Sequence, residues 1–200
     1  MVINFTTNYQ FATRVKLNGS LLDTIHETKL LGTVFSSDMK WHKNSQLLTQ
    51  KGYQRMSILR NLYQFDIPRE DLVLIYNMYI RSILEFNSNV WFLSITLDKR
   101  ESIERVQRIA CKIILKEEYV SYKDALDKLN LQSLSDRRQI LAKRFATKSA
   151  NNERFRDLFP LNAPHTQLRK NEKYQVKFAH TGRLQNSAIP EMQKLLNREK

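Results

Sequence analysis

The sequence predicts a mainly α-helical protein with a small antiparallel β portion at its N-terminus. Only four Gly and four Pro occur in 200 residues, so few turns interrupt the chain. Apolar residues recur at helical spacing over most of residues 37–150, whereas residues 1–36 alternate and are rich in β-branched side chains. Hydrophobic residues make up 42% of the chain, which is typical of a folded domain with an apolar core.

The strand-rich segment, residues 1–36, is expected to form a piece of sheet rather than a domain. MVINFTTN alternates, and ATRVKL and SLLDTIHE are expected to pair antiparallel across Asn18-Gly19, a dipeptide typical of two-residue hairpins. KLLGTVFSS predicts a further strand. Roughly three or four strands therefore precede the helices.

Helical periodicity predicts the elements of a bundle over residues 37–150. The first helix runs from Trp41 to about Tyr63. In the second, Pro68 occupies the first helical position, where its missing N–H costs nothing, and the apolar stripe continues to Leu84. A third helix follows the turn at residue 96. Its apolar face holds Ile103, Val106, Ala110, Ile113 and Ile114.

Two capping pairs indicate where the last helices of the bundle begin: Ser121 with Asp124, and Ser133 with Asp136. The helix that follows Ser133 is expected to turn its large apolar residues inward and its cations outward. The residues expected to face inward are Ile140, Leu141 and Phe145.

Residues 151–200 are predicted to be a basic tail. The stretch from Pro160 to Ser187 is polar and aperiodic, and we expect it to be extended or poorly ordered. One short helix starts at Ile189-Pro190 and ends near Leu196.

The net charge favours a polyanionic partner. Thirty-three Lys+Arg against 20 Asp+Glu leave +13 at pH 7, and the larger share of the excess lies in residues 101–200. Neutralised phosphates release counterions, which favours nucleic acid; acidic proteins and membrane surfaces are the alternatives that charge alone leaves open. No apolar run approaches the ~18 residues of a membrane helix. We therefore expect a soluble, intracellular protein without a membrane partner.

No pattern predicts an active site, a metal site or a cofactor. Cys111 is the only cysteine, which excludes a disulfide within the chain, and it is expected to be a buried, unreactive thiol. The four histidines lack the spacing of metal ligands. Several aromatic residues are expected to pack in the core rather than stack on bases. They are Trp41, Tyr76, Tyr79 and Trp91.

The order and spacing of several segments carry a family resemblance. The chain contains, in this order, TKLLGTVFSSDMKWHKN, RMSILRNLY, LVLIYNMYIRSILEFNSNVW, IERVQRIACKIIL, YKDALDKLNLQSLSDRRQILAKRF and NSAIPEMQKLLN. Together they resemble the carboxyl-terminal part of a non-LTR (LINE-like) retrotransposon reverse transcriptase, an RNA-directed DNA polymerase.

The resemblance implies palm strands in residues 1–36 and a thumb domain, which holds the template–primer duplex, in residues 37–150. Lys29, Leu31 and Gly32 would lie on the primer-grip hairpin, where a glycine permits close approach of the backbone to the primer strand. An ordinary turn at a strand end is the alternative interpretation of Leu31 and Gly32.

The resemblance also implies that this chain alone does not catalyse polymerisation. The family's catalytic carboxylates, including an Asp-Asp turn, lie upstream of the segments matched here, and phosphoryl transfer relies on metal ions that those carboxylates hold. Mg²⁺ is therefore expected only for a full-length polymerase. Because the family acts on chromosomal DNA, the resemblance implies a location in the nucleus.

Cations at helical spacing are the candidate contacts to a nucleic-acid backbone. One group lies on the third helix: Arg105, Arg108 and Lys112. A denser group lies on the helix that follows Ser133: Arg137, Arg138, Lys143, Arg144 and Lys148. If about five phosphates are neutralised, the log–log salt slope is expected to be roughly −4 to −5. A solvated helix face is the alternative for each residue.

Two other functions remain open from the sequence. The helices could form a protein-interaction module, or the chain could be a transposon remnant without a function of its own. In either case the strands of residues 1–36 would leave an unpaired edge. The partner at that edge would be a palm domain or a second copy of the chain.

Overall fold

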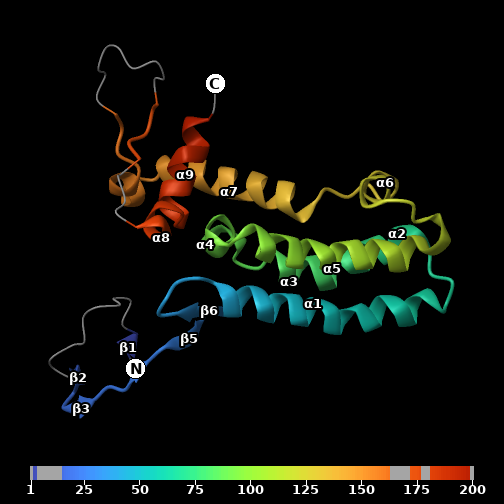
Figure 1. Ribbon diagram of the computed structural model, residues 1–200, viewed down its shortest axis with the longest axis horizontal. Helices are drawn as coiled ribbons and strands as arrows, with labels where there is room; N and C mark the ends of the chain where they lie inside the picture. The colour runs from blue at the N-terminus through green and yellow to red at the C-terminus, as the bar shows by residue number, and fades with distance from the viewer. Residues whose placement is uncertain (1, 4–14, 163–171, 177–180, 199–200) are drawn as a thin grey trace.

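The predicted fold class, mainly helical with a small N-terminal β portion, is confirmed in the computed structural model (Figure 1). The structure describes residues 2–3, 15–162, 172–176 and 181–198. The strands are β1 (Val2–Ile3), β2 (Lys16–Leu17), β3 (Ser20–Leu21), β4 (Thr24–Ile25), β5 (Glu27–Leu30) and β6 (Thr33–Ser36). The long helices are α1 (His42–Tyr63), α5 (Leu97–Leu115) and α7 (Leu134–Ala150).

Shorter helical segments connect and cover the long ones. They are α2 (Arg69–Ile75), the π-helix η1 (Tyr76–Arg81), α3 (Ser82–Leu84), α4 (Ser88–Trp91), η2 (Phe92–Ser94), η3 (Lys116–Glu118), α6 (Tyr122–Lys128), η4 (Glu153–Leu158), α8 (Gly182–Gln185) and α9 (Ala188–Asn197). In the described part of the chain, no helix combines the length and the apolar character needed to cross a bilayer.

The first strands pair in two different ways. β2 and β3 are antiparallel across Asn18 and Gly19, whose φ angles of 49° and 80° suit a two-residue hairpin, as predicted. β1 instead runs parallel to β4, with Val2 opposite Thr24. Most of MVINFTTN and the start of ATRVKL lie outside the described residues.

KLLGTVFSS is a hairpin rather than the single strand that its composition predicts. β5 and β6 are antiparallel, with Leu30 opposite Thr33. The two residues between them, Leu31 and Gly32, both have positive φ, at 45° and 84°. A two-residue loop with positive φ at both positions matches the twist of the strands, so the chain reverses inside the apolar run.

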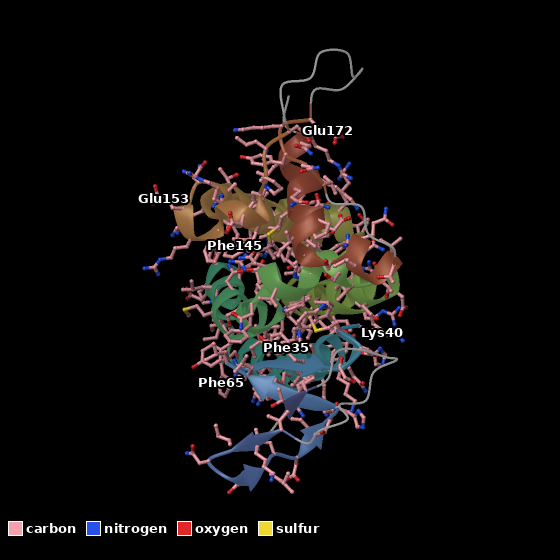
Figure 2. The ribbon with its side chains drawn as sticks, turned by 90° about the vertical axis from the view of Figure 1, so that its left-hand side faces the viewer. Phe35, Lys40, Phe65, Phe145, Glu153 and Glu172 are labelled. Carbon is pink, nitrogen blue, oxygen red and sulfur yellow. The ribbon has the colours of Figure 1, made fainter. Side chains whose placement is uncertain are left out.

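The helices stack in three layers (Figure 1). α1 forms one outer layer and packs mainly on α5. α3 and α5 lie in the middle layer, and α7 with α9 forms the layer opposite α1. Figure 2 shows the same order from the side: Phe35 and Phe65 lie on the α1 side of the molecule, and Phe145 lies on the α7 side.

The core lies between these layers. Trp41, Tyr76, Trp91 and Cys111 are buried, as predicted. A close approach at Gly52 allows α1 to pack on α5, because a Cβ there would lie 2.9 Å from Cγ1 of Val106 and 3.0 Å from Cδ2 of Leu84.

The predicted second helix is interrupted by a π-helix. Pro68 precedes α2, and Arg69 is its first residue. After Ile75 the backbone widens into η1 before α3 completes the segment. Tyr76 and Ile80 both point into the core, whereas Tyr79 is exposed to 50%. The prediction that Tyr79 packs in the core is therefore wrong, because the π-helix turns its side chain outward.

The inward face of α7 also differs from the prediction. Its buried residues are Leu134, Arg138, Ala142, Ala146 and Ser149, which recur at helical spacing. Of the three residues predicted to face inward, Ile140 and Phe145 are exposed and Leu141 is half-buried. Small Ala side chains allow α7 to lie close to its neighbours, so the helix turns this face, and not the face that carries Ile140 and Phe145, toward the core.

The C-terminal segment is partly packed on the bundle. Met192 and Leu196 of α9 are buried, and α9 packs on α7, η2 and α4. Phe159 and Tyr174 contact each other edge to face at 6.2 Å. The described part of the predicted aperiodic stretch therefore has ordered contacts.

Candidate nucleic-acid interface

The β5–β6 hairpin is fixed to the bundle by side-chain amides. Nδ2 of Asn87 donates to Oγ1 of Thr33 at 2.8 Å and to the carbonyl oxygen of Leu31 at 3.3 Å. Oδ1 of Asn44 accepts from the backbone N–H of Val34 at 3.2 Å. The hairpin is thus held against both α1 and the start of α4.

A cleft of about 530 Å³ lies where the hairpin, the middle of α1 and the α3 segment meet. Its cationic lining residues are Lys29 from β5 and Lys51 and Arg55 from α1. Its other lining residues are Gly32, Leu48, Gln54, Ser82, Ile83 and Phe86. No carboxylate belongs to this described lining, so the cleft offers three positive charges without a local counter-charge. We call it the basic cleft.

Arg55 is held at the edge of the basic cleft by the π-helix. Nη1 of Arg55 donates to the carbonyl oxygen of Tyr79 at 2.8 Å. The guanidinium carbon also lies 5.9 Å from the centre of the Tyr79 ring, within the range of a cation–π contact. One backbone bond leaves the other guanidinium donors available to an anion.

Leu31 and Gly32 lie at the tip of the hairpin, beside the basic cleft. Leu31 is exposed to 84%. Gly32 faces the ring of Phe86, because a Cβ at this position would lie 2.8 Å from Cε1 of that ring. The side of Gly32 on which other residues carry a Cβ atom therefore packs against the ring of Phe86. This contact requires a glycine at position 32.

The cations predicted on α5 are partly engaged within the protein. Arg108 pairs with Glu101 at 2.9 Å and lies over the ring of Tyr122. Nζ of Lys112 lies 5.2 Å from the centre of the Tyr119 ring. Arg105 is exposed. Arg108 and Lys112 thus have structural contacts that compete with binding to phosphate.

One of the cations predicted on α7 is not on the surface at all. Arg138 is 1% exposed, its Nη2 donates to the carbonyl oxygen of Leu84 at 3.0 Å, and its guanidinium lies over the rings of Trp91 and Phe92. Burial lowers the pKa of Arg138 to about 10. The prediction that Arg138 contacts phosphate is corrected, because α7 turns this side chain into the core.

The remaining α7 cations divide into two kinds. Nε of Arg137 lies 2.7 Å from Oε1 of Glu85, in a partly buried ion pair. Lys143, Arg144 and Lys148 are exposed. The expected five-residue stripe is therefore reduced to three exposed cations.

The predicted cations do not gather on one surface. The basic cleft lies on the α1 side of the bundle, whereas α7 lies in the opposite outer layer (Figure 1). Lys51 and Arg55 were not predicted as site residues, although their spacing of four on one helix indicates a shared face. What the sequence does not indicate is that this face lies opposite Lys29.

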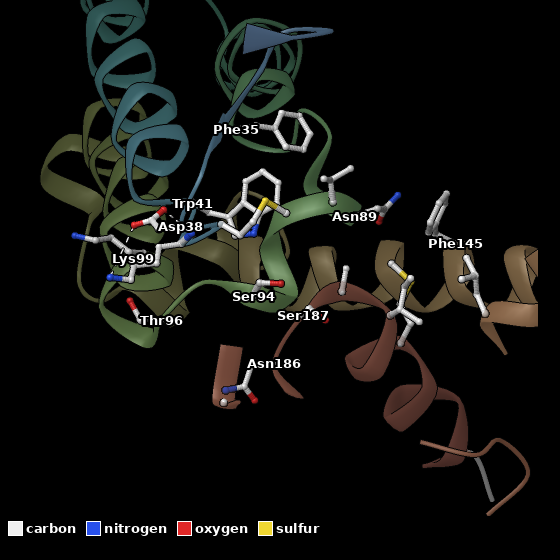
Figure 3. A pocket seen from close by; sticks show the side chains of 18 of the residues that line it. Phe35, Asp38, Trp41, Asn89, Ser94, Thr96, Lys99, Phe145, Asn186 and Ser187 are labelled. Atoms are coloured by element: carbon white, nitrogen blue, oxygen red, sulfur yellow. Dashed lines mark hydrogen bonds and ion pairs between the residues drawn. The ribbon is translucent and has the colours of Figure 1, made fainter. Parts of the chain in front are cut away.

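A second and larger recess lies where the segment after β6 meets α4, α7 and α9 (Figure 3). This apolar groove of about 900 Å³ is lined by side chains from the segment after β6, from α4, from α7 and from α9. Phe35 and Trp41 meet edge to face at 5.1 Å on one side, and Phe145 of α7 lies on another. Few charged residues line it, so it does not suit a phosphate backbone.

The described residues hold no group of three or more His, Cys, Asp or Glu side chains placed to share a metal ion. The basic cleft likewise presents cations, one serine and an amide as its polar groups. Its chemistry is that of anion binding. The fold and the cleft define a helical bundle that carries a β-hairpin over a cationic recess. The chain matches no protein-family model, no curated protein and no solved structure.

Proposed function

We propose that this chain binds the sugar–phosphate backbone of nucleic acid in the basic cleft, as a thumb-like module without polymerase activity of its own. The resemblance to non-LTR reverse transcriptases supports a template–primer as the bound nucleic acid and the nucleus as its location. It also supports assigning the metal-dependent step, with its Mg²⁺, to palm carboxylates of a longer polymerase.

The observation that carries the proposal is the charge of the cleft. Lys29, Lys51 and Arg55 converge from two segments of the chain on one recess whose described lining holds no carboxylate. Like charges placed together repel one another unless an anion joins them. A phosphate backbone supplies successive anions along its length, and Lys and Arg side chains are its usual contacts.

The test is the salt dependence of binding to a labelled RNA/DNA duplex, followed by fluorescence anisotropy. If the three cations neutralise about three phosphates, the log–log salt slope is roughly −3. The double variant Lys51→Ala/Arg55→Ala is expected to weaken binding and to reduce the slope by about two.

Lys43→Ala is the matched control. Lys43 lies on the same helix but is paired with Glu27, and its replacement removes one positive charge away from the cleft. An unchanged slope in the double variant, or an equal change in Lys43→Ala, would contradict this site. Template-dependent primer extension by the purified chain would contradict the proposed absence of catalysis.

The second candidate function is a protein-interaction module, which the apolar groove and the exposed residues of the N-terminal strands favour. Leu17, Leu21 and Leu30 are exposed on β2, β3 and β5, and among the described residues each strand of these two-stranded ladders pairs along one edge only. Sedimentation of the chain over a concentration series tests self-association. Replacing Leu30 by Lys is expected to suppress it if the β5 edge is the contact.

A further inference from the structure

We propose that the basic cleft binds unpaired nucleotides, with their phosphates on Lys29, Lys51 and Arg55 and their bases stacked on Tyr79 and Phe86. This inference rests on the proposed function and specifies its substrate as a single strand or the unpaired part of a template–primer. The observation behind this inference is that exposed aromatic rings lie beside the cations of the cleft.

Two aromatic side chains border the basic cleft and are exposed. Phe86 belongs to the lining and is 45% exposed. Tyr79 contacts Arg55 through its ring and its carbonyl oxygen. Tyr79 lies in η1 and Phe86 follows α3, so the two residues are about two helical turns apart along one segment.

The structure explains why these rings face outward. Tyr76 and Ile80 occupy the core on either side of Tyr79, and the wider turn of η1 places Tyr79 on the outer face. Phe86 meets the hairpin through Cε1 and Cζ, the ring atoms that lie nearest Gly32, which leaves part of its ring open. Neither ring is needed to fill the core, so both are available to a ligand.

Exposed rings beside cations fit an unpaired strand better than a duplex. In a duplex the base faces are stacked on one another, and a protein reaches only phosphates, sugars and base edges. Unpaired bases offer their faces, and stacking on Tyr or Phe beside a positively charged groove is the common mode of binding single strands. The phosphates of such a strand would meet the same three cations.

The experiment measures the affinity of the full chain for labelled strands of about 16 nucleotides, the upper site size of a single binding fold. The probes are oligo(dT), oligo(U), an abasic strand of equal length and a blunt duplex. The abasic strand keeps every phosphate and lacks every base. Tighter binding of oligo(dT) or oligo(U) than of the abasic strand is expected, and the tighter of the two is the preferred strand for the variants.

Variants of Tyr79 test whether bases stack on its ring. Tyr79→Ala is expected to weaken binding of the preferred base-containing strand by about 5- to 100-fold and to leave the abasic strand unaffected, whereas Tyr79→Phe retains the affinity. Phe65→Ala is the control, since Phe65 is 74% exposed and follows the far end of α1. Thermal unfolding followed by circular dichroism establishes that each variant is folded.

The results separate this inference from the proposed function. Equal affinity for abasic and base-containing strands, or an unchanged affinity in folded Tyr79→Ala, overturns the stacking of bases and leaves backbone binding intact. Tighter binding of the blunt duplex than of every single strand also overturns it. Absence of salt-dependent binding to any probe overturns the proposed function itself.

Discussion

The carboxylate of Glu104, on α5, accepts hydrogen bonds at the N-terminus of α7, where its Oε1 lies 2.9 Å from the backbone nitrogen of Leu134. Its Oε2 accepts from Ser135 N–H at 3.0 Å, and the hydroxyl of Tyr122 on α6 donates to the same carboxylate. A negative group at a helix N-terminus satisfies free N–H groups and meets the positive end of the helix dipole. One side chain thus joins α5, α6 and α7.

We expect Glu104→Gln to destabilise the bundle by about 1–3 kcal/mol, because an amide has one acceptor oxygen and leaves a buried N–H without a partner. Denaturation in urea measures the change. Glu101→Gln is the control, since Glu101 lies exposed on the same helix with Arg108 as its partner and is expected to cost at most about 1 kcal/mol. Equal losses in the two variants would contradict the role given to Glu104.

Arg138 is expected to act on stability and not directly on nucleic acid. Arg138→Ala removes a buried side chain that donates to the Leu84 carbonyl and packs on Trp91, and truncation of a large buried side chain costs about 2–5 kcal/mol. Arg138→Met keeps much of the side-chain volume and is expected to recover part of the stability lost in Arg138→Ala. Arg144→Ala, at an exposed position of α7, should change stability by at most about 0.5 kcal/mol. If Arg138→Ala were as stable as the unchanged protein but bound nucleic acid more weakly, a direct contact of Arg138 with nucleic acid would be supported instead.

Gly32→Ala is expected to destabilise the protein by about 2–4 kcal/mol, since positive φ strains an alanine and its Cβ would meet Phe86. Gly19→Ala has the same strain without a neighbour within 4 Å and should cost less. A double-mutant cycle with Phe86→Ala tests the contact: the cost of Gly32→Ala should fall when the ring is absent. If the losses of stability from Gly32→Ala and Phe86→Ala were additive, backbone strain alone would explain why position 32 requires a glycine.

Gly52→Ala is expected to destabilise the bundle although alanine favours helix by about 1 kcal/mol. Its Cβ would overlap Val106 and Leu84, and overpacking of this kind costs about 1–3 kcal/mol. Asn61→Ala, at an exposed position of the same helix, should be neutral or slightly stabilising. Thermal unfolding of the two variants checks the opposite signs, and a stabilising Gly52→Ala would contradict close packing of α1 on α5.

Cys111 provides a probe of unfolding and of its pH dependence. Burial raises the pKa of its thiol to about 12, so a thiol reagent should modify it only in the unfolded chain. In the unfolded state the thiol ionises near its ordinary pKa, roughly 8.5. The unfolded state then binds fewer protons than the folded state, so stability should fall as pH rises above about 8.5. Fast labelling of the native protein at neutral pH would contradict this.

Local sequence signals predicted the helices well where one face is strongly apolar or a cap is present. The capping prediction at Ser121 and Ser133 is confirmed, since their hydroxyls accept from the N–H groups of Asp124 and Asp136. These signals act between neighbouring residues, so they are readable without the fold. The rotation of α7 about its axis cannot be predicted from such local signals, because it depends on which helices lie beside it.

Composition and periodicity alone determined that this protein is a mainly helical bundle with a positive charge and an N-terminal hairpin turn at Asn18-Gly19. Only the tertiary structure decided which cations are available: it buries Arg138, pairs Arg137 with Glu85 and brings Lys29 opposite Lys51. The reason is physical. Helical and turn propensities depend on residues a few positions apart, whereas burial and the meeting of charges depend on how layers distant in sequence pack together.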